Sequence, residues 1–256
     1  LYGTNGFGQY WDGNITLGAH STINAANNFY IDGVISGSSK NLTKTGTGTV
    51  ILRGTNTYSG TTTVSAGTLN IGGSGSLGSG TYAGNISNSG TFTYASSTAQ
   101  TLSGVISGSG ELTKSGSSTL TLSGTNTYSG DTTISAGAIT VSGLLGNGSY
   151  AGGIANSGTL TLSSSSAQTL SGVISGSGGI TKSGSGNLTL SGNNTTTGTI
   201  SLSSGNLIAG SDNAFGSAPT ISASNTPTLK TSDGVTLPSL EVTGDIILET
   251  SIATTG

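Results

Sequence analysis

The chain has 256 residues, a net charge of −3 and only 6% charged residues, so neither an acidic nor a basic face can dominate its surface. Six Lys and Arg residues are too few for a protein that binds the phosphate backbone of nucleic acids. The chain has no cysteine, which excludes a disulfide framework, and its 46 glycines show no Gly-X-Y triplet that would indicate collagen.

The first twelve residues are rich in aromatic side chains, among them Phe7, Tyr10 and Trp11. We expect residues 1–32 to form N-terminal aromatic-rich coils. Packing of Trp11, Phe7 and Tyr10 on an adjoining coil is the favoured interpretation. A recognition patch formed by these side chains is the alternative.

From Gly13 onward a short theme recurs, in which Gly or Ser is followed by alternating polar and apolar residues. Its first apolar positions are Ile15, Val50, Leu69, Phe92, Leu120, Ile139, Leu160, Leu188 and Leu207. After a longer first interval, which leaves room for one more coil near Ile31, the intervals are those of single coils of a β-solenoid. Period two places the aliphatic side chains inside and the Thr and Ser hydroxyls outside. No window has the 3.6-residue period of an amphipathic helix.

A longer phrase organises residues 33–210. It begins GVISGS at Gly33, Gly104 and Gly172, so the repeat is about 70 residues long and occurs three times. We expect Leu52, Leu122 and Leu190 to be equivalent inward positions, and likewise Leu42, Leu112 and Ile180. Residues 211–256 contain all three prolines, and we interpret them as irregular C-terminal coils of one solenoid that spans residues 1–256.

The phrase GVISGSGGITKSGSGNLTLSG resembles the autotransporter-associated β-strand repeat of bacterial passenger domains. The resemblance implies an all-β protein with a right-handed parallel β-helix, which we expect to have about 10–11 coils and essentially no helix. It implies export through an outer-membrane β-barrel of the full-length precursor and an extracellular place on the bacterial outer-membrane surface. Because the chain contains no methionine and no visible leader, we expect it to be an internal piece of such a protein.

Residues that could carry chemistry are few, and the repeat brings no catalytic residues with it. His20 is the only histidine, and we expect it to face solvent. A polysaccharide-active enzyme on a parallel β-helix would need clustered carboxylates, and only Asp233, Glu241, Asp245 and Glu249 are concentrated. We interpret these acids as a solvated surface and predict a protein that is not an enzyme, without catalytic, cofactor or metal residues.

Three polar positions recur in the phrase. Lys44, Lys114 and Lys182 share one position, and we expect them to be solvated, outward lysines that discourage lateral pairing. Asn56, Asn126 and Asn194 share another, which is typical of corner amides that bond to neighbouring backbone. Tyr58 and Tyr128 share a third, where Thr196 stands in the last copy, and stacking on carbohydrate is a possible role for the two tyrosines.

These features predict a structural stalk or fibre segment of a bacterial surface protein, an adhesin that serves adhesion or cell–cell aggregation. The expected partners are adjoining β-helix coils or other copies of the chain, and cell-surface glycans or proteins, but no nucleic acid. The first alternative is a secreted subunit that stacks head to tail into filaments, because open coil edges seek another strand. The polysaccharide-active enzyme is the second alternative.

Overall fold

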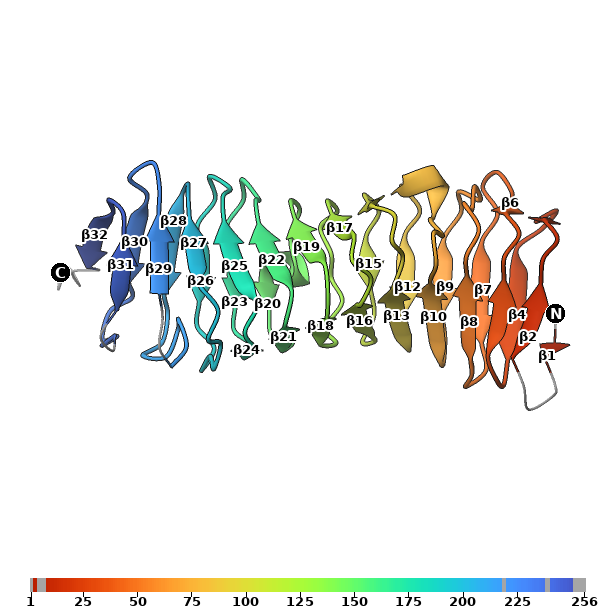
Figure 1. Cartoon of the computed structure of the whole chain (residues 1–256), viewed down its shortest axis with the longest axis horizontal. Helices are drawn as coiled ribbons and strands as arrows, with labels where there is room; N and C mark the ends of the chain where they lie inside the picture. Colours follow the sequence, from red (N-terminus) through yellow and green to blue (C-terminus); the bar gives the residue numbers. More distant parts are fainter. Residues whose placement is uncertain (1, 4–7, 218–219, 238–239, 251–256) are drawn as a thin grey trace.

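A computed structural model describes residues 2–3, 8–217, 220–237 and 240–250. The described residues form 32 strands, and every strand pairing among them is parallel. The strands of successive coils follow one another along a rod, with the first coils and the last at opposite ends (Figure 1). The molecule is an all-β parallel β-solenoid of about twelve turns, which confirms the predicted fold class.

Helix is limited, in the described part of the chain, to two three-residue 3-10 turns, η1 (Gly78–Gly80) and η2 (Gly146–Gly148). Their middle residues, Ser79 and Asn147, have positive φ values of 55° and 53°. No helix among the described residues is long and apolar enough to cross a membrane.

Three faces run along the rod, and we number them in chain order. Face 1 consists of two six-stranded sheets. Their strands are β1 (Tyr2–Gly3), β4 (Ser21–Ala25), β7 (Leu42–Thr45), β9 (Thr62–Val64), β12 (Ile86–Asn88) and β15 (Ile106–Ser107), then β20 (Ser149–Tyr150), β23 (Gln168–Leu170), β26 (Leu188–Leu190), β28 (Asn206–Ala209), β30 (Thr228–Thr231) and β32 (Ile247–Thr250).

Face 2 is one nine-stranded sheet. Its strands are β2 (Gln9–Trp11), β5 (Phe29–Ile31), β8 (Thr49–Leu52), β10 (Thr68–Ile71), β13 (Thr91–Tyr94), β16 (Glu111–Lys114), β18 (Thr132–Ile134), β21 (Ile154–Asn156) and β24 (Ile174–Ser175). Strand β5 is the additional coil for which the long first interval near Ile31 left room.

Face 3 consists of a two-stranded and a nine-stranded sheet. Its strands are β3 (Ile15–Thr16) and β6 (Ile35–Ser36), then β11 (Thr81–Tyr82), β14 (Gln100–Leu102), β17 (Thr119–Leu122), β19 (Ala138–Val141), β22 (Thr159–Leu162), β25 (Gly179–Lys182), β27 (Ile200–Leu202), β29 (Thr220–Ala223) and β31 (Glu241–Thr243).

Each of the three sequence copies has one segment that is not a strand but still bonds to the coil before it. Two of these segments interrupt faces 3 and 1, and the third follows β24, the last strand of face 2. Residues 55–58 continue face 3, where the Thr57 amide donates to Ile35 O at 2.8 Å. Residues 125–128 continue face 1, where the Thr127 amide donates to Ile106 O at 2.8 Å. Residues 194–196 continue face 2, where the Thr195 amide donates to Ile174 O at 2.9 Å. The three segments are the same stretch of the three sequence repeats.

The sequence repeat therefore turns around the rod by one face per copy. Leu52 lies in β8 on face 2, Leu122 in β17 on face 3 and Leu190 in β26 on face 1. Register partners in neighbouring coils are about twenty residues apart, as in the pairing of Leu102 with Leu122. A repeat of about 70 residues thus fills three coils and one further face, and equivalent residues do not lie above one another.

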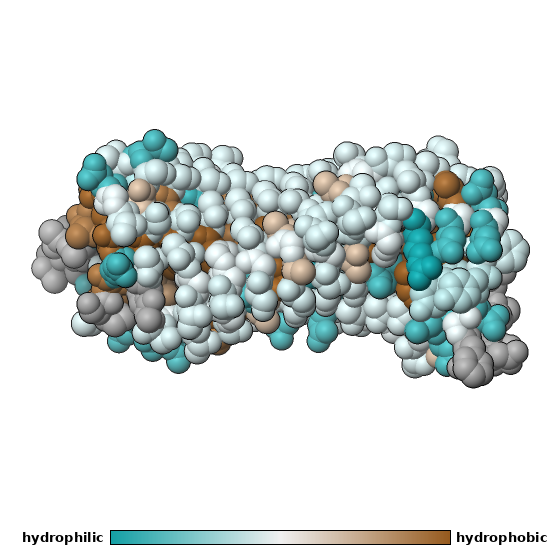
Figure 2. All heavy atoms as spheres, viewed as in Figure 1, coloured by the Kyte–Doolittle hydropathy of each residue, from teal (hydrophilic) through white to brown (hydrophobic). Residues whose placement is uncertain are grey.

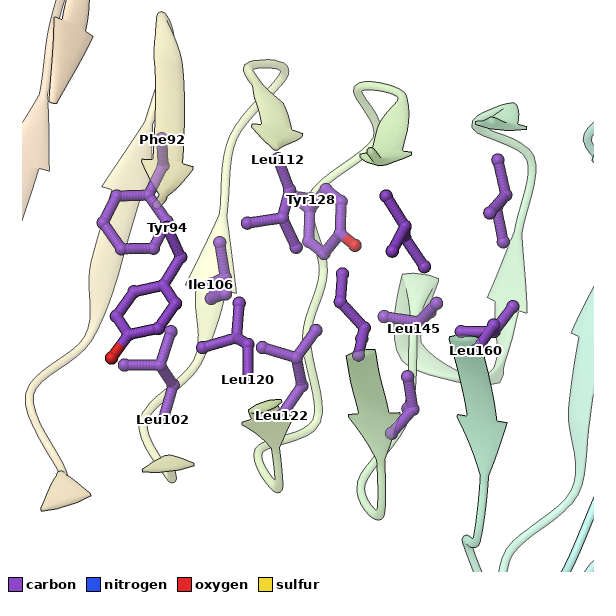
Figure 3. Close-up of a cluster of buried hydrophobic side chains, with 14 of the residues drawn as sticks. Phe92, Tyr94, Leu102, Ile106, Leu112, Leu120, Leu122, Tyr128, Leu145 and Leu160 are labelled. Carbon is purple, nitrogen blue, oxygen red and sulfur yellow. The ribbon is translucent and has the colours of Figure 1, made fainter. Parts of the chain in front are cut away.

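The core is a column of inward side chains from all three faces (Figure 3). On β17, Leu120 and Leu122 have no exposed surface, whereas Thr119 and Thr121 alternate with them on the outer side. All six predicted inward positions, Leu52, Leu122, Leu190, Leu42, Leu112 and Ile180, are buried. Each buried aliphatic side chain contributes about 1.5–3 kcal/mol, so the stability of the rod accumulates coil by coil.

The outer surface carries few strongly hydrophilic side chains. It is pale along most of the rod, with the strongest teal toward the two ends (Figure 2). This pattern agrees with outward rows of Thr and Ser, such as Thr101, Thr121 and Thr140 on face 3.

Candidate functional site

The recurring lysines are inside the rod, so the prediction that they are solvated and outward was wrong. The exposed fractions of Lys44, Lys114 and Lys182 are 1%, 0% and 2%. Lys114 stands in the inward column of face 2, between Tyr94 of the preceding coil and Ile134 of the next. Because the repeat turns by one face per copy, the three ammonium groups lie on faces 1, 2 and 3, not in one line.

Backbone carbonyls at the coil corners compensate for the burial of each ammonium group. Lys44 Nζ donates to Thr45 O at 2.8 Å, to Gly46 O at 2.7 Å and to Ala66 O of the next coil at 3.1 Å. Lys182 Nζ donates to Gly184 O and to Ser204 O of the next coil, the latter at 3.0 Å, and Lys114 Nζ donates to Gly116 O. Burial lowers the pKa of all three lysines below the ordinary value. Each lysine thus donates hydrogen bonds to the carbonyls of a coil corner from inside the rod, and Lys44 and Lys182 also bond to the corner of the next coil.

The recurring asparagines clamp neighbouring coils, as the corner interpretation predicted. Asn126 is fully buried, and its Oδ1 accepts from the Ile106 amide at 2.9 Å. Its Nδ2 donates to Gly124 O at 3.0 Å and to Leu144 O at 3.1 Å. One side chain therefore bonds to its own coil, the preceding coil and the following coil. Asn56 makes the same three contacts, and Asn194 bonds to Ile174 N and Ala214 O.

The recurring tyrosines belong to the core, so the possible role of Tyr58 and Tyr128 in stacking on carbohydrate is ruled out by their burial. Their exposed fractions are 0% and 1%. Tyr128 Oη lies 2.8 Å from Thr132 Oγ1, which lies 2.8 Å from Tyr150 Oη in the next coil. Tyr58, Thr62 and Tyr82 repeat this arrangement.

Burial shifts the titration of these phenols. It raises the pKa of Tyr82 and of Tyr150 to about 12, against an ordinary value of 10. Burial also raises the pKa of Tyr58 and Tyr128 well above the ordinary value. All four phenols stay neutral at physiological pH, and each Tyr–Thr–Tyr network joins two coils at the segment that interrupts a face.

The N-terminal aromatic residues have a different environment. Tyr10 is 60% exposed and Trp11 42% exposed, both on β2 at the start of face 2. Phe7 lies outside the described residues. Of the five predicted surface residues, the structure thus leaves Tyr10 and Trp11 at the surface.

The titratable residues on the surface do not converge. His20 is exposed, as expected, and its Nδ1 accepts from the Asn41 amide at 3.0 Å. Glu241 lies on face 3, and Glu249 lies on face 1, where it pairs with Lys230 at 2.6 Å. No group of three His, Cys, Asp or Glu residues that could hold a metal ion occurs within the part of the chain that the structure describes. The C-terminal acids are exposed and distributed over separate faces, as solvated side chains are.

The inward lysines were missed, although the sequence contains a signal for them. Leu112 and Lys114 are two residues apart in a strand, and period two places them on the same side. The next-coil members of the two tyrosine networks, Tyr82 and Tyr150, carry no comparable signal. Thr62 and Tyr82 are twenty residues apart, and only the register of the coils brings them together.

A family model for the passenger-associated-transport-repeat matches three segments of the chain, residues 42–71, 112–141 and 180–209. Each segment covers four strands, begins at the inward residue two positions before the buried lysine and includes the Asn clamp. The repeat and the solenoid fit a non-enzymatic segment of a surface-exposed or secreted protein. No curated protein and no solved structure matches the chain.

Proposed function

We propose that this chain, which carries three repeats of an autotransporter passenger domain, is a stalk or fibre segment that serves adhesion or cell–cell aggregation. The observation that carries the proposal is the continuity of the rod. Parallel ladders on three faces stack the coils through about twelve turns, with the ladder of face 2 ending at β24, and buried Lys, Asn and Tyr side chains join the coils from within. Such a rod holds other groups at a fixed distance from the cell. An outer-membrane β-barrel of the precursor is its expected anchor.

Display on a bacterial cell tests this role. The chain is fused to an outer-membrane β-barrel, and settling of the cells and their attachment to host-cell monolayers are compared with cells that carry the barrel alone. A displayed Asn126→Ala variant controls for the fold, because this change removes a clamp that joins three coils. The proposal predicts faster settling or stronger attachment with the intact rod only. Equal behaviour of intact-rod and barrel-only cells would contradict it.

Head-to-tail stacking into filaments is a second candidate, and apolar surface at both end coils favours it. A cavity of about 320 Å³ lies beside the first coils and is lined by residues that include Ile15, Leu17 and Ile23. At the other end Leu248 is 72% exposed on β32. Strand edges and apolar side chains at an open coil end pair readily with another ladder. Electron microscopy at rising protein concentration should show lengthening filaments, and uniform short rods would argue against this candidate.

A further inference from the structure

The outer row of face 2 changes character at its first three strands. In later coils this row contains Thr93, Thr113 and Thr133. At the start of the same face, the equivalent positions hold Tyr10, Tyr30 and Ile51. Bulky apolar and aromatic side chains on the outside of a Thr-rich rod contribute nothing to its core, and an exposed patch of this kind marks an interaction site.

These side chains are held in one arrangement by contacts among themselves. The rings of Tyr10 and Tyr30 stack with 4.5 Å between their centroids and 8° between their planes. The guanidinium group of Arg53 lies 4.4 Å from the Tyr30 ring centroid and 5.9 Å from that of Tyr10. Arg53 Nη1 also pairs with Asp32 Oδ1 at 3.5 Å. Because the groups are ordered before a partner arrives, binding costs them little conformational entropy.

The same groups remain accessible to solvent. Tyr10 is 60% exposed on the outer side of β2, whereas Trp11, whose register partner is the buried Ile31, stands at the start of the inward row. The side chains of Arg53 and Asp32 keep 38% and 37% of their surface. Aromatic surface, guanidinium donors and a carboxylate acceptor thus lie side by side across three neighbouring coils. We call this set, Tyr10, Tyr30, Asp32 and Arg53, the aromatic patch.

We propose that the aromatic patch binds a neutral oligosaccharide. The C–H groups on one face of a pyranose ring carry partial positive charge and pack against the electron-rich face of an aromatic ring. Arg53 donates and Asp32 accepts hydrogen bonds, which suits the neighbouring hydroxyl groups of a sugar. Three coils span about 10 Å from first to third, the length of about two sugar rings.

Charge and size favour this partner over others. The opposite charges of Arg53 and Asp32 offset each other, so the patch has no excess positive charge for an acidic glycan or a nucleic acid. A stable protein partner needs about 800 Å² on each side with an apolar centre, whereas the rows beyond the patch carry Thr and Ser hydroxyls. A short, uncharged sugar chain fits the area that the patch provides.

The inference deepens the proposed adhesive function, and it rests on that function only in placing the rod at the cell surface. The first measurement uses the purified chain on a printed array of defined neutral and acidic oligosaccharides, followed by calorimetric titration with the neutral oligosaccharide that binds best. The variants are Tyr10→Ala, Tyr10→Phe and Arg53→Gln, with Thr133→Ala as a matched control from the same outer row. Circular dichroism melts of all variants check that the rod remains folded.

The proposal predicts that the wild-type chain and Thr133→Ala bind neutral glycans with equal affinity. Tyr10→Ala and Arg53→Gln should bind about tenfold more weakly, whereas Tyr10→Phe keeps the ring and stays close to the wild type. Absence of binding to the whole array, binding that Tyr10→Ala leaves unchanged, or a preference for acidic glycans would each overturn the proposal. Cells that display the rod and still adhere when the purified chain binds no glycan would refute this inference and leave the stalk function standing.

Discussion

Asn126 offers a quantitative test of how the coils are held together. Replacement by Ala removes three hydrogen bonds at a fully buried position and leaves the Ile106 amide and the carbonyls of Gly124 and Leu144 without that partner. At about 1–1.5 kcal/mol for each bond, the free energy of unfolding should fall by about 3–4.5 kcal/mol. An outward substitution in the preceding strand, Thr121→Ala, should change it by less than about 0.5 kcal/mol.

Urea denaturation of the purified variants, followed by circular dichroism, measures both values. Asn126→Asp tests whether the hydrogen bonds donated by the side-chain amide are needed, because it places a carboxylate oxygen against the two carbonyls to which the amide donates. This variant should be strongly destabilised at neutral pH and should recover part of the loss in acid, where the carboxyl group is protonated. A decrease of less than about 1 kcal/mol in the free energy of unfolding of Asn126→Ala would refute the idea that the Asn side chains hold the stacked coils together.

Three further measurements test other parts of the fold. Gly137→Ala should lower the free energy of unfolding by at least about 2 kcal/mol in urea denaturation, because the φ of Gly137 is +68° and a Cβ would lie 2.4 Å from Gly116 O and from Ser118 O. Gly18→Ala is the neutral control, because a Cβ at Gly18 meets nothing within 4 Å. Equal losses for the two variants would contradict this reasoning. Tyr82 and Tyr150 contribute stability that is fully present below pH 10 and is lost as the pH rises through about 12, at about 3 kcal/mol for each. Urea titrations at pH 9 and 11.5 should show this loss, and it should shrink in the double Phe variant; equal stability of the wild type at both values would refute it. Lys114 acts in the opposite sense, because its lowered pKa makes the folded chain gain stability as the pH rises toward 10.5. Lys114→Met should lack this gain between pH 8 and 10, and parallel curves for variant and wild type would count against it.

Much of the fold could be predicted from alternation and repetition. The six inward aliphatic positions were assigned correctly, because period two leaves one side of a strand for the core and a single coil has one inside. The corner role of Asn126 was predicted for a similar reason, since an amide that recurs at a turn usually bonds to backbone. These are local properties, and local sequence determines them.

The remainder depends on which coil lies above which. Lys44 and Lys114 were assigned to the outside because an isolated lysine is costly to bury, and the carbonyls that offset this cost come partly from the next coil. Tyr58 and Tyr128 looked available for a ligand because the rings that pack on them, Tyr82 and Tyr150, belong to the next coil. The aromatic patch shows the same limit, since Arg53 reaches Tyr30 and Asp32 only through the register of β5 and β8.

The turn of the repeat by one face per copy has a mechanical consequence. Each copy contains one segment without a strand, and the three segments fall on faces 3, 1 and 2 in succession. The three strandless segments therefore lie at different positions around the rod axis. A repeat of three whole coils would align every gap along one side and give the rod a preferred direction of bending. With a remainder of one third of a coil, the strandless segments of the three copies lie on three different faces, so no two of them are aligned along one side of the rod.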